Sequence, residues 1–381
     1  MQKQVGNVWL MQKINRLKVL NYIRKNPDIS RPMLAKATGL SLSSITNIVV
    51  YLMEKRLVAE TGIEEADRVG RKSTLLRCDF KYYRLICVEA GTDVATIAVT
   101  DLGGNIIDKK EISIAGLSFK DAIVSIKEQI KGFMTNKRNK VLAIGFAVSA
   151  LVCDGKGTLL SSSMKWEGEN LKEELEAEFK VPAFVENLTI TKAAGQLEPH
   201  ESKIYENIVF ADIEKGFGAV QIYKGEINRA LIGEIGHTTI CIDGEKCFCG
   251  NNGCLEIMCS PDRVARKYNE QKGTDFTVSQ VMEIQDETSK ALFAECGEYM
   301  GAGLANLVNM LAPSLLIISG GEMYNDTVME TAINAVKRRA YGVLTKNLEF
   351  KSVKVGNENS IKGIARCLCD KVFSIDSDIV D

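Results

Sequence analysis

Residues 233–256 constrain this chain more than any other stretch. They hold one of its two histidines, His237, and three of its eleven cysteines, Cys247, Cys249 and Cys254. Cys247 and Cys249 are two residues apart, so both sulfur atoms can face one point, and the turn-forming string Gly-Asn-Asn-Gly can bring Cys254 back to it. One histidine and three cysteines make a closed tetrahedral ligand set for a structural Zn²⁺. We predict zinc here; the alternative is a group of buried, reduced thiols.

The same stretch resembles the signature of the ROK family, which is named for repressors, open reading frames and kinases. It reads Gly-Glu-Ile-Gly-His and then Cys-x-Cys-Gly-x-x-Gly-Cys-Leu-Glu, and it matches the family pattern at every spacing. The resemblance implies that the histidine and the cysteines bind zinc and that Glu234, His237 and Glu256 face a sugar. A metal would fix the tautomer of His237 and leave its other ring nitrogen free to hydrogen-bond outward. Without the resemblance, both glutamates would be interpreted as ordinary surface acids.

The composition is typical of a globular protein with more than one domain. The chain has 381 residues, 45% of them hydrophobic and 25% charged, which is enough for two or three domains. No run approaches 18 apolar residues and the N-terminus has no apolar signal core, so we expect no membrane span and no secretion signal. An odd number of cysteines without a signal indicates the reducing cytoplasm, where metal binding is more common than a disulfide framework.

Charge is distributed unevenly along the chain. Residues 1–80 hold 14 lysines and arginines against seven aspartates and glutamates, although the whole chain carries a net charge of only −1. This asymmetry indicates a basic, nucleic-acid-binding segment attached to an acidic remainder.

The basic segment has the pattern of a helix-turn-helix. Apolar spacing predicts one helix over 12–26 and a second, short helix after Ser30. Gly39 ends the second helix, and Ser41 can cap a third over roughly 42–55. Helix, short turn with glycine and helix is the order of a DNA-binding helix-turn-helix. Small polar side chains open the third helix, where they can reach base edges and phosphates; a solvated polar face is the alternative. The candidate DNA contacts on it are Ser41, Ser43, Ser44, Thr46 and Asn47.

A basic loop follows the third helix. Short predicted strands at 57–58 and 75–76 flank a polar loop that carries Arg71 and Lys72. We interpret this loop as a wing and these two side chains as candidate contacts to phosphate or to the minor groove. The segment 30–76 also resembles the winged-helix head of ROK repressors, in its serine-rich helix and in the Gly-Arg of its wing.

From about residue 83 the pattern changes to alternating strands and helices. Apolar runs predict strands, and 3.6-residue periodicity predicts helices between them. A strand–turn–strand unit over 208–223 repeats the start of this region. The order resembles the two-lobed actin-like, hexokinase-type (ribonuclease H-like) fold of ROK domains. The predicted elements are strands over 85–89, 95–100, 141–148, 183–185 and 315–319 and helices over 120–136, 171–179, 261–271, 277–285 and 287–311.

We therefore predict an α/β protein of three parts. A winged helix-turn-helix occupies 1–80, and the first ROK lobe occupies 81–195. A C-terminal helix at about 361–381 completes the first lobe. The second lobe, with the zinc site, occupies 196–360.

Kinases of this family and fold share three further elements, and each is altered here. The Asp-x-Gly-Gly-Thr turn is Glu89-Ala-Gly-Thr-Asp93, and the Gly-Thr-Gly-x-Gly-Ala-Gly loop is Glu214-Lys-Gly-Phe-Gly-Ala-Val220. These changes put carboxylates or a branched side chain where the backbone should approach phosphate. The Glu-Asn-Asp that supplies the general base is Glu-Asn-Leu188, and leucine cannot accept a proton. We therefore predict that the chain is not an enzyme.

The resemblance also places Asn187 on the sugar, because an amide suits a sugar hydroxyl. The loss of the aspartate beside it removes one hydrogen-bonding group from the pocket. A Ser-Ala at 149–150, in place of the family's Pro-Gly, is a second departure. Trp166 has two interpretations, an aromatic side chain near the cleft or simple core packing.

The combined pattern predicts a transcriptional repressor of carbohydrate-metabolism genes. It would bind operator DNA as a homodimer or tetramer and release it when a monosaccharide favours another arrangement of the lobes. Members of the family respond to or act on xylose, glucose and N-acetylated hexosamines, and the sequence does not choose among them. The alternatives are an ATP-dependent sugar kinase with a fused regulator, and a DNA-binding regulator without a sugar inducer that a protein partner controls.

Overall fold

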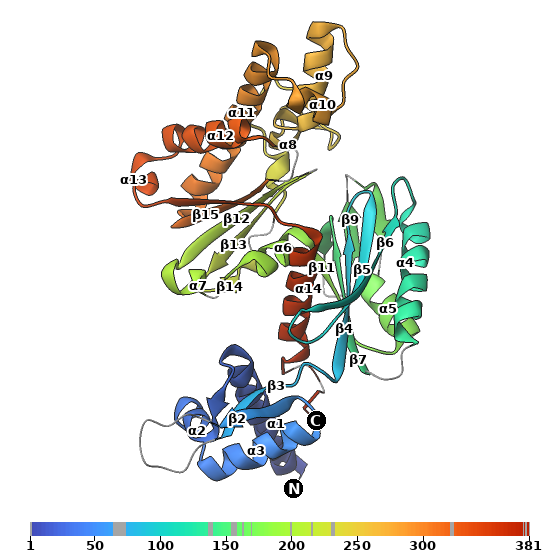
Figure 1. The fold of residues 1–381 in the computed structure, drawn as a ribbon, viewed down its shortest axis with the longest axis vertical. Helices are drawn as coiled ribbons and strands as arrows, with labels where there is room; N and C mark the ends of the chain where they lie inside the picture. Colours follow the sequence, from blue (N-terminus) through green and yellow to red (C-terminus); the bar gives the residue numbers. More distant parts are fainter. Residues whose placement is uncertain are drawn as a thin grey trace.

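The structure is a computed structural model with three parts in chain order. A winged helix (blue in Figure 1) lies at one end of the molecule. The first lobe, which contains β4 and β7, lies next to it, and the second lobe, which contains β12 and β15, lies at the far end. The structure describes residues 2–380 except 64–73, 136–139, 154–157, 162–163, 169, 199, 215, 230–232, 321–323, 376 and 378.

Three helices and a small sheet form the winged helix. The two helices of the helix-turn-helix meet at 114°, in the range of about 90–120° that DNA-binding pairs show. Gly39 ends the first of them with φ of 73°, and the Ser41 side chain caps the second by accepting a hydrogen bond from Ser44 N at 3.1 Å. The predicted helix-turn-helix is thus confirmed. Its elements are α1 (Gln2–Lys25), β1 (Ile29–Ser30), α2 (Arg31–Thr38), α3 (Leu42–Glu54), β2 (Val58–Ile63) and β3 (Thr74–Cys78).

The two candidate wing contacts, Arg71 and Lys72, lie outside the described residues. The strands on both sides of that loop pair with each other antiparallel, with β3 in the middle of the three-stranded sheet. No single described helix is long and apolar enough to cross a membrane; α2 and α3 reach that length and composition only when joined across their bend.

Two five-stranded sheets with the same topology form the body. In each, two hairpins place three consecutive strands antiparallel, and two later strands add parallel to the first of the three. This repeat confirms the predicted two-lobed, duplicated fold. The first sheet contains β4 (Tyr83–Ala90), β5 (Val94–Thr100), β6 (Ile106–Ser113), β7 (Lys140–Val148) and β11 (Ala183–Asn187), and the second contains β12 (Asn207–Ile213), β13 (Phe217–Tyr223), β14 (Glu226–Ile227), β15 (Leu315–Gly320) and β16 (Glu349–Val353).

Helices cover the faces of these sheets because the central strands are buried on both faces, as in β4, where six consecutive side chains are buried. A small sheet of β8 (Leu151–Cys153), β9 (Thr158–Ser161) and β10 (Trp166–Gly168) lies beside the first lobe. The helices of the body are α4 (Phe119–Met134), α5 (Leu171–Phe179), α6 (Leu188–Gln196), α7 (Glu201–Ile204), α8 (Leu255–Met258), α9 (Pro261–Lys272), α10 (Val278–Glu283), α11 (Glu287–Leu311), α12 (Asp326–Arg339), α13 (Gly342–Thr345) and α14 (Asn357–Val372).

The last helix, α14 (red in Figure 1), returns the chain to the first lobe and packs on β4, β7 and α6. Two glycines make its crossing with α6 close. A Cβ on Gly363 would lie 1.7 Å from Thr191 O, and a Cβ on Gly195 would lie 2.0 Å from Asn359 O. The crossing therefore accommodates no side chain at either position.

The winged helix is attached to the body through α1 and the C-terminal segment. Arg16 donates to Val380 O at 2.9 Å, and Asn21 donates to Phe373 O at 2.9 Å. One hydrophobic cluster runs from Leu20 of α1 to Leu368 of α14. The head and the end of α14 therefore share a core.

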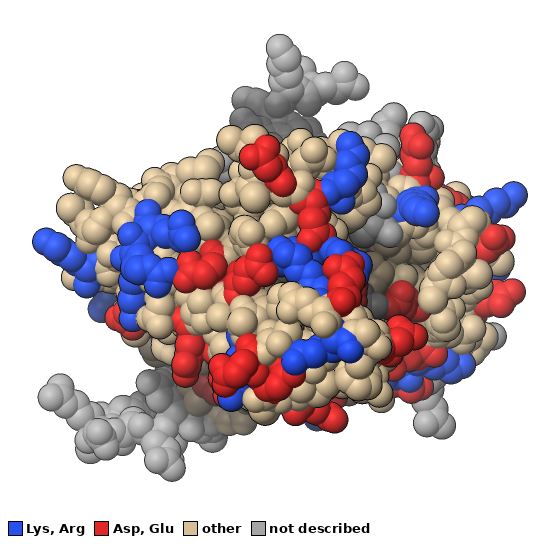
Figure 2. All heavy atoms as spheres, turned by 90° about the horizontal axis from the view of Figure 1, so that it is seen from above, with Lys and Arg blue, Asp and Glu red and all other residues tan. Residues whose placement is uncertain are grey.

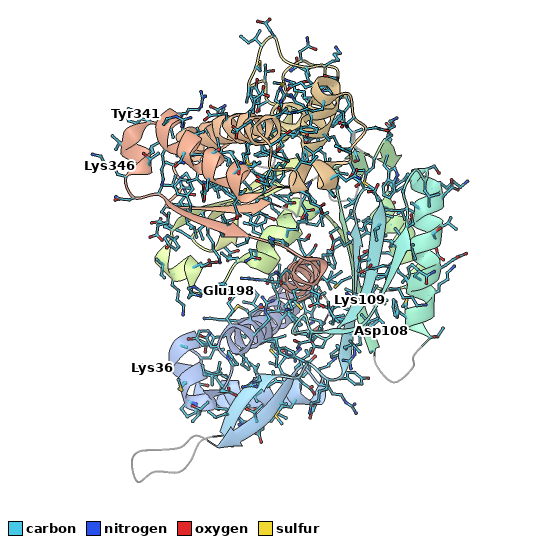
Figure 3. The ribbon with its side chains drawn as sticks, turned by 45° about the horizontal axis from the view of Figure 1, so that its top comes forward. Lys36, Asp108, Lys109, Glu198, Tyr341 and Lys346 are labelled. Carbon is cyan, nitrogen blue, oxygen red and sulfur yellow. The ribbon has the colours of Figure 1, made fainter. Side chains whose placement is uncertain are left out.

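The opposite end of the molecule shows mixed charge. Figure 2 shows Lys and Arg side chains next to Asp and Glu side chains over the face seen from above. In Figure 3, Lys36 of α2 marks the winged-helix end, and Tyr341 and Lys346 mark the α13 corner of the second lobe. Charges of both signs side by side give that face no single-sign field for nucleic acid.

Trp166 is a core residue. Its side chain is 2% exposed, donates to Leu117 O at 3.1 Å and packs edge-on against Phe119. Of the two interpretations from the sequence, the structure supports core packing.

Candidate metal centre and interlobe cleft

His237, Cys247, Cys249 and Cys254 come together at one point. Their ligand atoms all lie within 4.8 Å of one another. His237 Nδ1 is 3.7 Å from Cys247 Sγ, and Cys249 Sγ is 3.6 Å from Cys254 Sγ. A tetrahedral zinc ion with bonds of about 2.0–2.3 Å separates its ligand atoms by about 3.5–3.8 Å. The four side chains therefore form a His/Cys cluster with the spacing of a metal site.

Two glycines make the turn that closes this cluster. Gly250 and Gly253 have φ of 97° and 63°, and a Cβ on Gly253 would lie 1.5 Å from Cys241 O. Burial raises the pKa of Cys254 to about 12, so this thiol keeps its proton until a cation displaces it. The turn thus brings Cys254 to the same point as the other three side chains of the His/Cys cluster.

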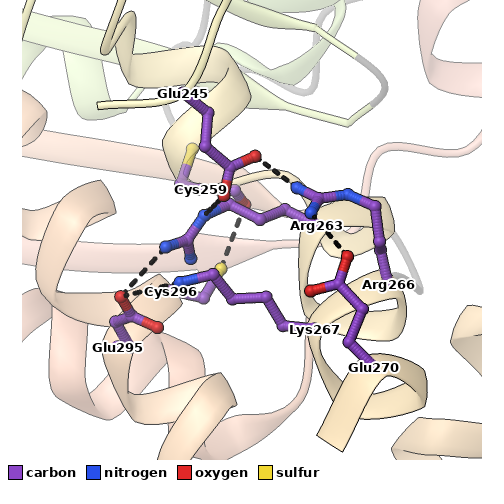
Figure 4. A network of polar contacts seen from close by, with 8 residues as sticks. All are labelled: Glu245, Cys259, Arg263, Arg266, Lys267, Glu270, Glu295 and Cys296. Atoms are coloured by element: carbon purple, nitrogen blue, oxygen red, sulfur yellow. Dashed lines mark hydrogen bonds and ion pairs between the residues drawn. The ribbon is translucent and has the colours of Figure 1, made fainter. Parts of the chain in front are cut away.

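A buried arginine fixes the same loop from outside (Figure 4). Arg263 of α9 is 3% exposed; its Nε donates to Glu245 Oε1 at 2.9 Å and its Nη2 to Glu295 Oε1 of α11 at 3.0 Å. The backbone of Glu245 in turn accepts from Gly253 N at 2.8 Å. This network ties the cysteine loop to two helices of the second lobe.

A cavity of about 680 Å³ opens between the lobes beside the cluster. All four candidate sugar-binding residues, Asn187, Glu234, His237 and Glu256, line it. Since His237 turns Nδ1 toward the cysteines, Nε2 is the ring nitrogen left for the cleft. Asn187 comes from the first lobe and the other three from the second.

The hydrogen bonds of these residues differ. Glu256 Oε2 accepts from Phe217 N at 3.0 Å, and burial raises the pKa of Glu256. Glu234 is exposed. Asn187 caps α6 by accepting from Thr189 N at 2.8 Å and donates to Ala150 O at 2.8 Å. The Asn187 amide keeps only one N–H and one lone pair for a ligand.

Sequence reasoning missed a charged cluster at the inner end of the cleft. Lys192 of α6 is 4% exposed, and its Nζ lies 2.9 Å from both Asp212 Oδ2 and Glu214 Oε2. Glu89, at the end of β4, lines the same cavity. One signal was present: a lysine within the segment Ile-Thr-Lys-Ala-Ala at 190–194, and an aspartate directly after the apolar run 208–211.

Burial and charge oppose each other in this cluster. Burial raises the pKa of Glu89 to about 7, although Lys192 pulls it down. Burial also raises the pKa of Asp212 against the pull of Lys192. Burial lowers the pKa of Lys192, but the carboxylates of Asp212 and Glu214 outweigh it and leave that pKa raised. The ammonium is therefore charged at neutral pH.

Leu188 begins α6, lines the cleft and is 8% exposed.

The candidate DNA contacts of α3 are exposed, and their hydroxyls form local hydrogen bonds. Thr46 Oγ1 donates to Leu42 O at 2.8 Å, and Ser41 Oγ lies 2.9 Å from both Ser43 Oγ and Ser44 Oγ. Asn47 is exposed on the same helix.

A winged helix joined to a two-lobed body, with a His/Cys cluster beside the cleft, defines the class of this protein as a DNA-binding regulator with a ROK body. The chain belongs to the ROK family, whose profile matches residues 85–371. A winged helix-turn-helix DNA-binding profile matches residues 13–57.

Similar proteins span nearly the whole chain. The xylose repressor of Bacillus spizizenii is 26% identical over 380 residues, 97% of this chain and 99% of the repressor. The N-acetylglucosamine repressor of Shigella flexneri is 24% identical and covers 96% of this chain and 94% of its own.

Solved structures share the fold. A ROK family transcriptional regulator, a homolog of the E. coli MLC protein, has a TM-score of 0.80 and 22% identity over 96% of this chain and 97% of its own. A ROK glucokinase from Streptomyces griseus, in complex with glucose and AMPPNP, has a TM-score of 0.63 and 22% identity over 74% of this chain and 98% of its own.

Proposed function

We propose that this protein is a sugar-responsive, DNA-binding transcriptional repressor. The observation that carries the proposal is one chain that joins a winged helix to a ROK body whose cleft has Leu188 in the place of a general base. Two relatives that span nearly the whole chain, named xylose repressor and N-acetylglucosamine repressor, support it. The genes it controls would then belong to carbohydrate metabolism.

Loss of kinase activity is part of the proposal. A general base contributes about 10²–10⁴-fold to the rate of such a reaction. The family motif places that base at position 188, where this chain has a leucine. The carboxylates that pair with Lys192 come from other positions and do not take its place. The sugar kinase remains the second candidate because a glucokinase shares the fold of the body.

We further propose that Zn²⁺ occupies the His/Cys cluster as a structural ion. A closed set of one histidine and three thiolates leaves no open position for a reacting water. The metal would hold Glu234, His237 and Glu256 in place at the cleft, where they bind the hydroxyls of a monosaccharide together with Asn187.

The fold offers a route from the cleft to DNA through α14. Ser360, near its start, lies close enough to Glu89 in the cleft to lower the pKa of that carboxyl. The other end of α14 contacts α1, where Asn21 holds Phe373 O. The helix spans 16 residues, or about 24 Å. A sugar that prefers one closure of the lobes would move α14 and with it the head.

The division into parts follows the same logic. We propose a head over 1–80, a first lobe over 81–195 completed by 361–381, and a second lobe over 196–360. Two heads in a homodimer or tetramer would read a palindromic operator, with α3 in the major groove and the wing on the backbone. Such a protein acts in the cytoplasm, with the DNA it regulates.

Binding to the DNA upstream of its own gene tests the head. Fluorescence anisotropy at several salt concentrations should show affinity that falls as salt rises, because phosphate contacts release counterions. The double variant Arg71→Ala/Lys72→Ala should reduce the slope of log K against log salt by about two per head. Affinity that does not depend on salt would exclude this role.

A further inference from the structure

We propose that the interlobe cleft takes an uncharged monosaccharide and rejects its phosphorylated form, because its inner end is a subsite for hydrogen-bond donors that is closed to anions. The inference rests on the proposed function and names the chemical class of its effector. Four observations support it.

Carboxylates dominate the wall of the cleft. The described side chains that line it include seven Asp or Glu residues against two lysines, Lys192 and Lys354. Lys354 is exposed, on the segment that joins β16 to α14. An anion that enters this cleft therefore meets mainly like charge, which costs more in a partly enclosed site than in bulk water.

The buried lysine is already neutralised. Lys192 is 4% exposed, and its ammonium lies 2.9 Å from Asp212 Oδ2 and 2.9 Å from Glu214 Oε2. Two carboxylates on one ammonium leave the group with a net negative charge. The cation that could have bound a phosphate is thus engaged with the protein itself.

Two buried acceptors of the same cluster lack a donor among the described residues. Glu89 Oε2 and Asp212 Oδ1 have no hydrogen-bond partner, and their residues are 9% and 7% exposed. Ser360 and Ser319 lie near enough to lower the pKa of these two carboxyls, but neither hydroxyl oxygen has a hydrogen-bond partner among the described residues. In their ionised form these oxygens accept from a sugar hydroxyl or a water, whereas a phosphate dianion offers them no donor.

The two altered phosphate turns supply the fourth observation. Asp93 and Glu214 line the cleft in the turns where ROK kinases approach phosphate. A phosphoryl group on a sugar bound at Glu256 and His237 would share one cavity with the side chains of these turns. It would meet two carboxylates there.

Thermal-shift and calorimetric titrations of the zinc-loaded full chain test the inference. The probes are D-xylose, D-glucose, N-acetyl-D-glucosamine, the 6-phosphates of the two hexoses, and AMPPNP with Mg²⁺. We expect one free sugar to raise the melting temperature with concentration. For a hexose, its 6-phosphate should bind at least about tenfold more weakly at low salt. AMPPNP should give no shift.

Charge removal separates electrostatics from shape. The ratio of the affinity for the free sugar to the affinity for the phosphorylated sugar should fall by about tenfold in the variant Asp93→Asn/Glu214→Gln. Asp108→Asn, which removes an exposed carboxylate on β6 (Figure 3), should leave the ratio unchanged. The inference is overturned if a sugar phosphate binds more tightly than the free sugar, or if the affinity ratio is unchanged in the double variant. Either result leaves the proposed repressor function unaffected. If no sugar binds in either form while DNA still binds, the effector role fails and the inference falls with it.

Discussion

Lys192→Met is the substitution that most sharply tests the physical account of the cleft. Methionine fills a similar volume but carries no charge, so Asp212 would remain 7% exposed with no cation beside it. Among the described residues, one oxygen of Asp212 already has no hydrogen-bond partner. Removing one partner of a buried ion pair costs about 3–5 kcal/mol. Glu214 adds little to this loss, because its side chain is 35% exposed and can turn to water.

The loss should depend on pH in a defined direction. Burial raises the pKa of Asp212 above its usual value, and Lys192 opposes that shift, so the variant raises this pKa further. A carboxyl whose pKa is higher in the folded state contributes stability at low pH that is lost as pH rises through the folded pKa. The variant should therefore fall further below the wild type at pH 7.5 than at pH 5.

Urea unfolding followed by tryptophan fluorescence in the background Trp9→Phe gives the measurement. Trp166 is then the one tryptophan of the sequence, and it is buried in the first lobe, where α6 begins at the end of β11. Lys224→Met, which removes an exposed partner of Glu206, is the matched control and should leave the midpoint unchanged. A Lys192→Met midpoint equal to that of the wild type at pH 7.5, or an equal deficit at both pH values, would refute the reasoning.

Three further predictions concern other parts of the molecule. Cys254→Ser should lose bound zinc, measured by metal analysis after chelating resin, and lower the melting temperature, whereas Cys367→Ala, outside the cluster, should retain about one zinc per chain. Gly363→Ala should destabilise the protein by at least about 1–3 kcal/mol, because its Cβ would lie 1.7 Å from a backbone oxygen; Gly132→Ala, with nothing within 4 Å, should instead gain up to about 1 kcal/mol. Asn21→Ala removes the hydrogen bond from α1 to Phe373 O. The variant should keep its affinity for sugar and its affinity for DNA, but bound sugar should lower DNA affinity less than in the wild type, as DNA titrations with and without sugar measure.

Local signals explain why some elements could be predicted closely. The serine cap and apolar stripe of α3 fix its start, and the helices α5 and α11 occupy the predicted 171–179 and 287–311. Capping and periodicity act within a few residues, so a sequence displays them directly. The His/Cys cluster could be predicted for the same reason, since all four side chains come from one stretch of chain.

Long-range features could not be predicted in that way. In the cluster of Glu89, Lys192 and Asp212, Glu89 lies more than a hundred positions before the other two residues, and only the pairing of two lobes brings all three together. The helix α6 was missed because its start, Leu-Thr-Ile-Thr, is as typical of a strand as of a helix until Asn187 caps it. The crossing at Gly195 and Gly363 likewise depends on two helices that are distant in the sequence.

The central claim is that a monosaccharide in the cleft controls DNA binding by the head. The most direct measurement is the anisotropy of a labelled DNA duplex from upstream of the gene, titrated with the zinc-loaded protein with and without each free sugar of the panel. The account predicts that one sugar lowers DNA affinity at least tenfold, a coupling of about 1.4 kcal/mol, and that Glu256→Gln abolishes this effect while DNA binding in the absence of sugar is retained. Specific DNA binding that no monosaccharide changes would contradict it.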